Sequence, residues 1–208
     1  MKNKNILIIS VIFTLLIALF FAGTKWFNAP VSKDSSRLIS LNSLSYGNPK
    51  AKVTIVEFFD PACETCALFS PLVKELVKKH EPNLRVILRY APFHENSISV
   101  VRMLEATRAQ GKYFEALEAV FNYQRAWTIN HVVYPAKVWP ILEYVGVDIV
   151  ALKEQMKDPK IEELIEKDIE DAKALGATKT PSFFVNGKPL ESFGYEQLVK
   201  LIESELKK

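Results

Sequence analysis

The longest hydrophobic stretch of this chain lies near its start. Between Lys4 and Lys25 no residue carries a charge, and most residues are aliphatic or aromatic. A helix rises about 1.5 Å per residue, so this stretch can span the roughly 30 Å hydrocarbon core of a bilayer. Residues 6–24 are therefore predicted to form a transmembrane anchor. Because Lys2 and Lys4 precede it, residues 1–5 are expected in the cytoplasm and the rest of the chain on the far side.

A cleaved signal peptide is the alternative interpretation of the same segment. Such a peptide usually has a shorter hydrophobic region, followed by a small-x-small cleavage site. A cut after Ala22 would put the large Phe20 where a small residue is needed, which favours the uncleaved anchor. Either interpretation exports the remaining chain to the periplasmic or extracytoplasmic side. Residues 25–37 are rich in polar residues without periodicity, and they are predicted to be a linker.

Two β-rich segments flank a helical pattern in the next part of the chain. Residues 52–59 are almost continuously apolar, which is typical of a central strand covered on both faces. Residues 63–79 place apolar side chains at helical spacing, and residues 84–90 again have the pattern of a strand. A strand, a helix and a second strand in succession predict a βαβ unit with parallel strands.

Residues 95–175 show no strand pattern and are predicted to form a helical insertion. Asp148 is a candidate N-cap, because its carboxylate can accept hydrogen bonds from the first free N–H groups of a helix. Residues 125–135 are expected to form a loop. The expected helices cover 97–110, 113–124, a short segment from Pro140, a segment after Asp148, and 160–175.

Strand patterns return after the insertion. Residues 182–185 and 188–190 are predicted to pair as a hairpin, since Asn186-Gly187 supplies the positive φ angles of a tight turn. Residues 195–206 form an amphipathic pattern and are predicted to be the last helix. The order of elements thus predicts an α/β fold interrupted by a helical subdomain.

Composition narrows the class of protein further. The chain has 208 residues, a length that suits one domain and an accessory segment. Its 27 basic and 24 acidic residues nearly cancel, leaving a formal charge of +3. This balance offers no basic stripe for a phosphate backbone, so nucleic-acid binding is not expected.

The only two cysteines, Cys63 and Cys66, are three positions apart. A disulfide-stapled scaffold would carry four or more spread along the chain, and a tetrahedral zinc site needs four ligands. The pair begins a predicted helix, whose free N–H groups and partial positive charge stabilise a thiolate. We therefore predict dithiol–disulfide chemistry in which Cys63 attacks, Cys66 resolves the mixed disulfide, and no cofactor is needed. An inert structural disulfide and part of a metal site remain alternatives.

Several features around this pair resemble the thioredoxin superfamily. A strand leads into Cys63-Glu64-Thr65-Cys66, Pro71 lies inside the following helix, and Thr180-Pro181 precedes a later strand. The helical insertion with Gly111-Lys112-Tyr113-Phe114-Glu115 is similar to the DsbA branch. The resemblance covers residues 45–208. It implies that residues 38–208 form a thioredoxin-like domain that exchanges disulfides with exported or unfolded proteins and works with a membrane redox partner.

The resemblance also implies roles for particular residues. Glu57 matches the carboxylate that relays a proton to the resolving cysteine. Pro181 matches the cis-proline that faces the cysteines, and Thr180 would offer its backbone to an extended substrate. The DsbA branch has a histidine where this chain has Thr65, and Glu64 adds a negative charge beside the pair. Both changes disfavour the thiolate, which predicts a weaker oxidant than DsbA.

The three histidines are given lesser roles. His94 follows the second strand and is expected to be a loop or packing residue, with a role near the active site as the alternative. His80 is expected to be a surface residue at a helix end, and His131 has no predicted role. The direction of electron flow stays open, so a reductase or isomerase kept reduced by a membrane donor is one alternative. A metal-binding or metal-delivery module using the two cysteines is another. A chaperone with incidental thiols is a further alternative.

Overall fold

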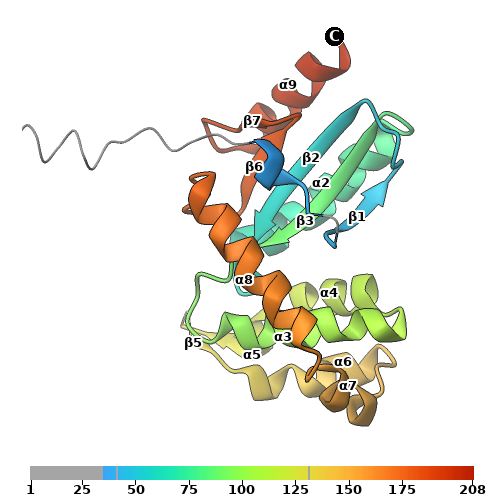
Figure 1. Ribbon diagram of the computed structural model, residues 1–208, viewed down its shortest axis with the longest axis vertical. Helices are drawn as coiled ribbons and strands as arrows, with labels where there is room; N and C mark the ends of the chain where they lie inside the picture. The colour runs from blue at the N-terminus through green and yellow to red at the C-terminus, as the bar shows by residue number, and fades with distance from the viewer. Residues whose placement is uncertain (1–34, 41, 131) are drawn as a thin grey trace, which may run out of the picture. The chain divides into compact units, whose positions relative to one another are not determined.

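The computed structural model describes residues 35–40, 42–130 and 132–208 (Figure 1). The predicted cytoplasmic end and anchor, residues 1–24, and most of the predicted linker lie outside these ranges. Within the described part of the chain, no helix is both long enough and apolar enough to cross a membrane.

A five-stranded sheet forms the centre of the domain, in the order β1-β3-β2-β6-β7. The predicted parallel pairing of β2 with β3 is confirmed, and the other neighbours are antiparallel. The strand β1 was not predicted, because an edge strand of four residues leaves too short an alternating pattern. The strands are β1 (Leu44–Gly47), β2 (Val53–Phe59), β3 (Leu84–Tyr90), β6 (Ser182–Val185) and β7 (Lys188–Pro189).

The central strand β2 is buried on both faces, as its apolar run predicted. Val53, Ile55 and Phe59 join a core with the helices α2 (Glu64–Lys79) and α9 (Tyr195–Leu206). The alternate residues, including Val56 and Phe58, pack in a second core with the C-terminal end of α8. The loop after β2 is therefore anchored from both sides of the sheet.

Helices and 3-10 turns fill the chain between β3 and β6, and most lie below the sheet in Figure 1. This confirms the predicted thioredoxin-like fold with a helical insertion. Asp148 is the predicted N-cap, accepting from the N–H groups of Val150 and Ala151. The elements are α3 (Ser97–Ala106), η2 (Thr107–Gln110), α4 (Tyr113–Asn122), α5 (Gln124–Trp127), η3 (Pro135–Lys137), α6 (Trp139–Tyr144), α7 (Ile149–Gln155) and α8 (Pro159–Ala174).

The prediction of an unstructured loop at residues 125–135 was wrong. The helix α5 extends to Trp127, and the strands β4 (Thr128–Ile129) and β5 (Val132–Val133) pair as a small antiparallel sheet. Two-residue strands carry no measurable alternation, so periodicity cannot detect them. This hairpin lies beside the cysteine pair, as described below.

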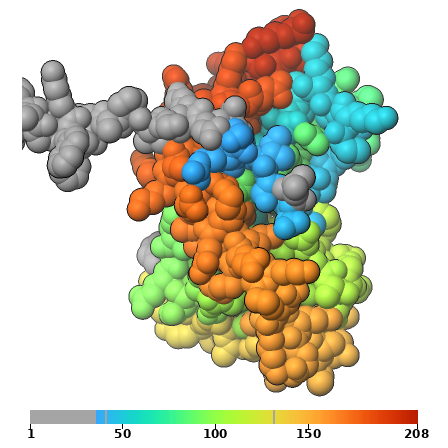
Figure 2. All heavy atoms as spheres, viewed as in Figure 1, coloured from blue at the N-terminus to red at the C-terminus, as the bar shows by residue number. Residues whose placement is uncertain are grey.

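A buried arginine joins the helical subdomain to the sheet. Arg89 of β3 is fully buried, and its guanidinium donates to Asp168 (2.6 Å) and Asp171 (2.7 Å) of α8. The same group donates to the carbonyl oxygens of Arg37 and Leu38 in η1 (Ser35–Leu38). The start of the described chain, blue in Figure 2, consequently lies against the orange helix α8.

Candidate active site

The cysteine pair lies where β2 leads into α2. Cys63 is the N-cap residue of α2 in an extended conformation, and its N–H group donates to the carbonyl of Asp60. The Asp60 carboxylate also accepts from the N–H of Ala62 at 2.8 Å, which folds the loop into a tight turn. Both thiols are free, with Cys63 7% and Cys66 0% exposed. Cys63 is thus the thiol that a substrate can reach.

The environments of the two thiols drive their pKa values in opposite directions. The pKa of Cys63 falls to about 5, chiefly because its thiolate accepts a hydrogen bond from Cys66. Hydrogen bonds from Thr180 and from the backbone N–H groups of Cys66 and Thr65 add to this and outweigh the cost of burial. Burial, and then the bond to Cys63, raise the pKa of Cys66 far above its ordinary value. At neutral pH Cys63 is therefore a thiolate and Cys66 a thiol.

Glu57 lies on β2 beneath the pair and is 4% exposed. Its pKa is raised to about 8, first by burial and then by the negative charge of Cys63. The charge of Glu57 in turn contributes to the raised pKa of Cys66. A small cavity of about 10 Å³ brings Glu57 together with Ser70 and Lys74 of α2. The carboxyl group therefore interacts electrostatically with both cysteines.

The loop before β6 meets the cysteines from the other side. The Thr180–Pro181 peptide bond is cis, as the resemblance implies. Sγ of Cys63 lies 3.2 Å from the carbonyl oxygen of Thr180, across 117 positions of sequence, and donates to it when the thiol is protonated. A groove of about 670 Å³ runs past this loop and is lined by Thr65, Pro181 and Phe193 among others. The structure thus brings Thr180 to Cys63 and places Pro181 beside it in the lining of the groove.

His94 lies in the loop after β3, as predicted, and it also borders the cysteine pair. A cavity of about 350 Å³ is lined by His94 together with Cys63, Glu64 and Thr65. A sequence signal for this position exists, because His94 follows β3 and the carboxyl ends of parallel strands meet at one edge of the sheet. Glu64 itself is exposed in the first turn of α2, and Thr65 lines both this cavity and the groove.

The other histidines lie apart from the cysteine pair or outside the described residues. His80 is half-buried at the C-terminal end of α2, and its Nε2 atom has no hydrogen-bond partner among the described residues. His131 falls outside the described ranges. In the part of the chain that the structure describes, no three His, Cys, Asp or Glu side chains are placed to hold a metal ion.

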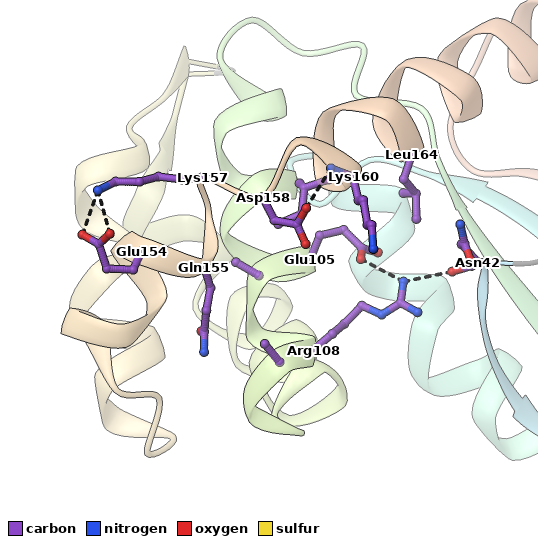
Figure 3. A pocket seen from close by; sticks show the side chains of 12 residues that line it. Asn42, Glu105, Arg108, Glu154, Gln155, Lys157, Asp158, Lys160 and Leu164 are labelled. Atoms are coloured by element: carbon purple, nitrogen blue, oxygen red, sulfur yellow. Dashed lines mark hydrogen bonds and ion pairs between the residues drawn. The ribbon is translucent and has the colours of Figure 1, made fainter.

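Another cavity, of about 590 Å³, lies in the helical subdomain (Figure 3). Four of the six charged side chains that line it form two ion pairs. Arg108 donates to Glu105 and to the carbonyl of Asn42, both at 2.9 Å, and Lys157 pairs with Glu154 at 2.7 Å. The cysteines do not line this cavity, so the redox chemistry belongs to the site at the start of α2.

The fold and the cysteine pair define a thioredoxin-like oxidoreductase with a helical insertion. The thioredoxin family model matches residues 40–204. A thioredoxin-like oxidoreductase from Silicibacter pomeroyi DSS-3 is 30% identical, with a TM-score of 0.72 over 84% of this chain and 98% of that one. The thiol-disulfide exchange protein alpha-DsbA2 from Wolbachia pipientis shares the fold, with 22% identity and a TM-score of 0.69 over 84% and 94% of the two chains. The chain belongs to the thioredoxin family, and its fold is also that of the DsbA-like structures.

A sequence match to a much longer protein accompanies these. The chain is 31% identical over 145 residues to the Na(+)/H(+) antiporter NhaA of Herminiimonas arsenicoxydans. That match covers 69% of this chain but 22% of the antiporter. The chain therefore spans about a fifth of the length of the first curated relatives that it matches.

Proposed function

We propose that this protein oxidises pairs of thiols in exported proteins by passing them the Cys63–Cys66 disulfide. The observation that carries this proposal is the opposed state of the two thiols, a Cys63 thiolate with a pKa of about 5 beside a buried Cys66 thiol. A low pKa at the accessible cysteine stabilises the reduced pair relative to its disulfide. The disulfide therefore tends to oxidise substrate thiols.

The proposed reaction has two exchange steps. A substrate thiolate attacks Sγ of Cys63 in the disulfide, and the electron pair of the broken S–S bond moves to Cys66. A second substrate thiolate then attacks the first substrate sulfur, and Cys63 leaves as a thiolate. The substrate gains a disulfide and the protein keeps the two electrons as its dithiol.

We infer that Glu57 supplies the proton that Cys66 takes up. A carboxyl group with a pKa of about 8 is largely protonated at neutral pH and can give its proton to a newly formed thiolate. It can take the proton back when the dithiol is reoxidised. The buried position of Glu57 between strand and helix supports this relay, because water has little access to Cys66.

We infer that substrates dock beside Thr180 and Pro181. The groove next to this loop is open to an extended chain, which can pair with exposed backbone groups as an added strand. Two apolar side chains near it are exposed, Phe193 at 50% and Leu68 at 69%. Exposed apolar surface of this kind favours unfolded polypeptides over folded ones.

We propose that the domain works outside the cytoplasm, tethered by residues 6–24 and reoxidised by a membrane redox partner. The support is the uncharged N-terminal stretch described above. A periplasmic thioredoxin-like protein from Salmonella enterica serovar Typhimurium has the same fold, with 21% identity and a TM-score of 0.67 over 84% of this chain.

The redox potential of the full-length protein tests the proposed function. The Cys63 pKa of about 5 lies between the roughly 3.5 of DsbA and the roughly 7 of thioredoxin. A potential between about −180 and −120 mV is therefore expected, on the oxidising side but below that of DsbA. The measurement is equilibration against a glutathione series, with the disulfide read by mass spectrometry and Cys63→Ser as the control that forms none. A value near −230 mV or below would favour a reductase. If no reversible Cys63–Cys66 disulfide forms, the oxidase and the reductase are both excluded.

Replacing Glu57 by glutamine is expected to stabilise the dithiol form at neutral pH. The folded-state pKa of about 8 exceeds the ordinary value of 4.5, so between these values the folded protein holds more protons than the unfolded chain. Stability from this group is present below the lower value and is lost as pH rises through about 8. Glu57→Gln should gain about 2–3 kcal/mol over wild type at pH 7 and little at pH 4, by urea unfolding.

The matched control for this stability experiment is Glu64→Gln at the exposed first turn of α2. This variant should stay within about 0.5 kcal/mol of wild type at both pH values. An equal free energy of unfolding for Glu57→Gln and wild type at pH 7 would show that Glu57 is not buried with a raised pKa.

A further inference from the structure

The proposed oxidation leaves one proton without an acceptor among the groups discussed so far. Two substrate thiols lose two protons and two electrons, and the electrons enter the Cys63–Cys66 disulfide. Cys66 keeps one proton because its pKa is strongly raised, whereas Cys63 leaves as a thiolate. The second proton must be taken from a substrate thiol on the side where it approaches Cys63.

His94 lies on that side of the site. It borders the cavity of about 350 Å³ formed by the start of α2 and by Thr128, Asn130 and Val133 of the β4–β5 hairpin. Its side chain is 30% exposed, so it can meet both the substrate and water. The cavity opens directly on Cys63, which also lines it.

The His94 ring is held by a buried carboxylate. Its Nδ1 atom lies 2.8 Å from Oδ2 of Asp60, and its backbone N–H donates to the same oxygen at 2.9 Å. Asp60 is fully buried, and its other oxygen accepts from the N–H of Ala62 and the hydroxyl of Ser97. Because an ionised carboxylate only accepts, the neutral ring must carry its proton on Nδ1. The lone pair is then on Nε2, the ring nitrogen that Asp60 does not bind.

The titratable groups that face the ring are all acidic. The groups that face it are Asp60 from the loop after β2, with Cys63 and Glu64 from α2, and all three carry or can carry negative charge. The described hairpin residues that line the cavity are uncharged. Among the described lining residues, His94 alone can accept a proton to become a cation.

We propose that His94 is a general base of the exchange reaction, taking the proton from the substrate thiol that attacks Cys63, with Asp60 as its positioning residue. This inference rests on the proposed function. In the first step the substrate S–H proton moves to Nε2, the new substrate–Cys63 S–S bond forms, and the Cys63–Cys66 bond breaks. Cys66 takes its proton from Glu57, and His94 releases the proton that it took from the substrate to water. The second substrate thiol loses its proton in the same way, and Glu57 is reprotonated, so one proton is released overall.

The test compares full-length wild type and His94→Asn in the oxidation of a dithiol peptide. An asparagine amide can still donate to Asp60 but is no base. At about pH 7.5, below the ordinary thiol pKa of about 8.5, roughly a tenth of the peptide thiol is ionised unaided, so the variant is expected to react up to about tenfold more slowly. Above about pH 9.5 the peptide ionises unaided, and the two rates should converge to within about twofold. His94→Gln should show the same pH-dependent loss.

The matched control is His80→Asn at the far end of α2, which should follow the wild-type pH profile. An unchanged profile in His94→Asn would overturn the inference. So would a loss that is equal at all pH values, which would mark a structural role instead. If wild type itself oxidises no dithiol peptide, it is the proposed function that fails. Thiolate absorbance of the reduced variants, titrating near the wild-type midpoint, confirms that the site is folded.

Discussion

Replacing Cys63 by serine is expected to reduce the rate of dithiol oxidation at least about 1,000-fold, the order of loss seen when an essential catalytic residue is removed. The reason is the state of its sulfur. Cys63 has a pKa of about 5 and remains partly accessible at the N-terminus of α2, whereas a serine hydroxyl neither ionises at neutral pH nor forms a disulfide. The measurement is the oxidation of a dithiol peptide by the full-length protein in glutathione buffer.

The variant Cys66→Ser is expected to trap an intermediate that Cys63→Ser cannot form. Cys63 is expected to form a mixed disulfide with substrate or glutathione that persists, because the resolving thiol is absent. Mass spectrometry should find one adduct on Cys66→Ser and none on Cys63→Ser. An adduct on Cys63→Ser, whether or not Cys66→Ser also forms one, would contradict the assignment of the attacking and resolving roles.

Replacing Arg89 by methionine is expected to lower the free energy of unfolding by about 3–5 kcal/mol, the usual cost of removing one partner of a buried ion pair. The guanidinium is fully buried and binds two carboxylates that are themselves almost inaccessible, Asp168 and Asp171. Methionine fills much of the volume but leaves both carboxylates without this partner. Urea unfolding at neutral pH measures the loss.

The pH dependence of this variant provides a second readout. Burial already raises the pKa of Asp168 to about 6 in the presence of Arg89. A carboxyl whose folded pKa is raised contributes stability at low pH that is lost as pH rises. Without Arg89 this pKa should rise further, so the deficit of Arg89→Met should shrink as pH is lowered towards about 4.

The matched control is Arg102→Met, which removes an arginine of similar geometry at the surface. Arg102 makes two hydrogen bonds to Glu162, but the side chains are 34% and 41% exposed. A loss of at most about 1 kcal/mol is expected for this pair, because water screens it and replaces its hydrogen bonds. Equal losses for the two variants would show that the Arg89 network does not stabilise the fold more than a surface pair.

Local patterns were sufficient to identify the main elements of the fold. The continuous apolar run of β2 predicted a strand covered on both faces, and the helical spacing after it predicted α2. Asn186-Gly187 predicted the β6–β7 hairpin, and Asp148 the start of α7. Each of these depends on residues only a few positions apart, so the sequence carries the information directly. The elements that escaped prediction, β1 and the β4–β5 hairpin, are too short to show a period.

By itself, the sequence determined the redox pair and its setting: two cysteines one helical turn apart, at the start of a helix that follows a buried strand. Only the tertiary structure decided what surrounds them. Thr180 reaches Cys63 across 117 positions, His94 reaches Asp60 across 34, and Arg89 reaches Asp168 across 79. Such contacts form when the strands and helices pack, and no local periodicity encodes which distant polar groups will meet. The pKa values that make the site reactive depend on these long-range contacts and on burial. They are therefore properties of the folded chain.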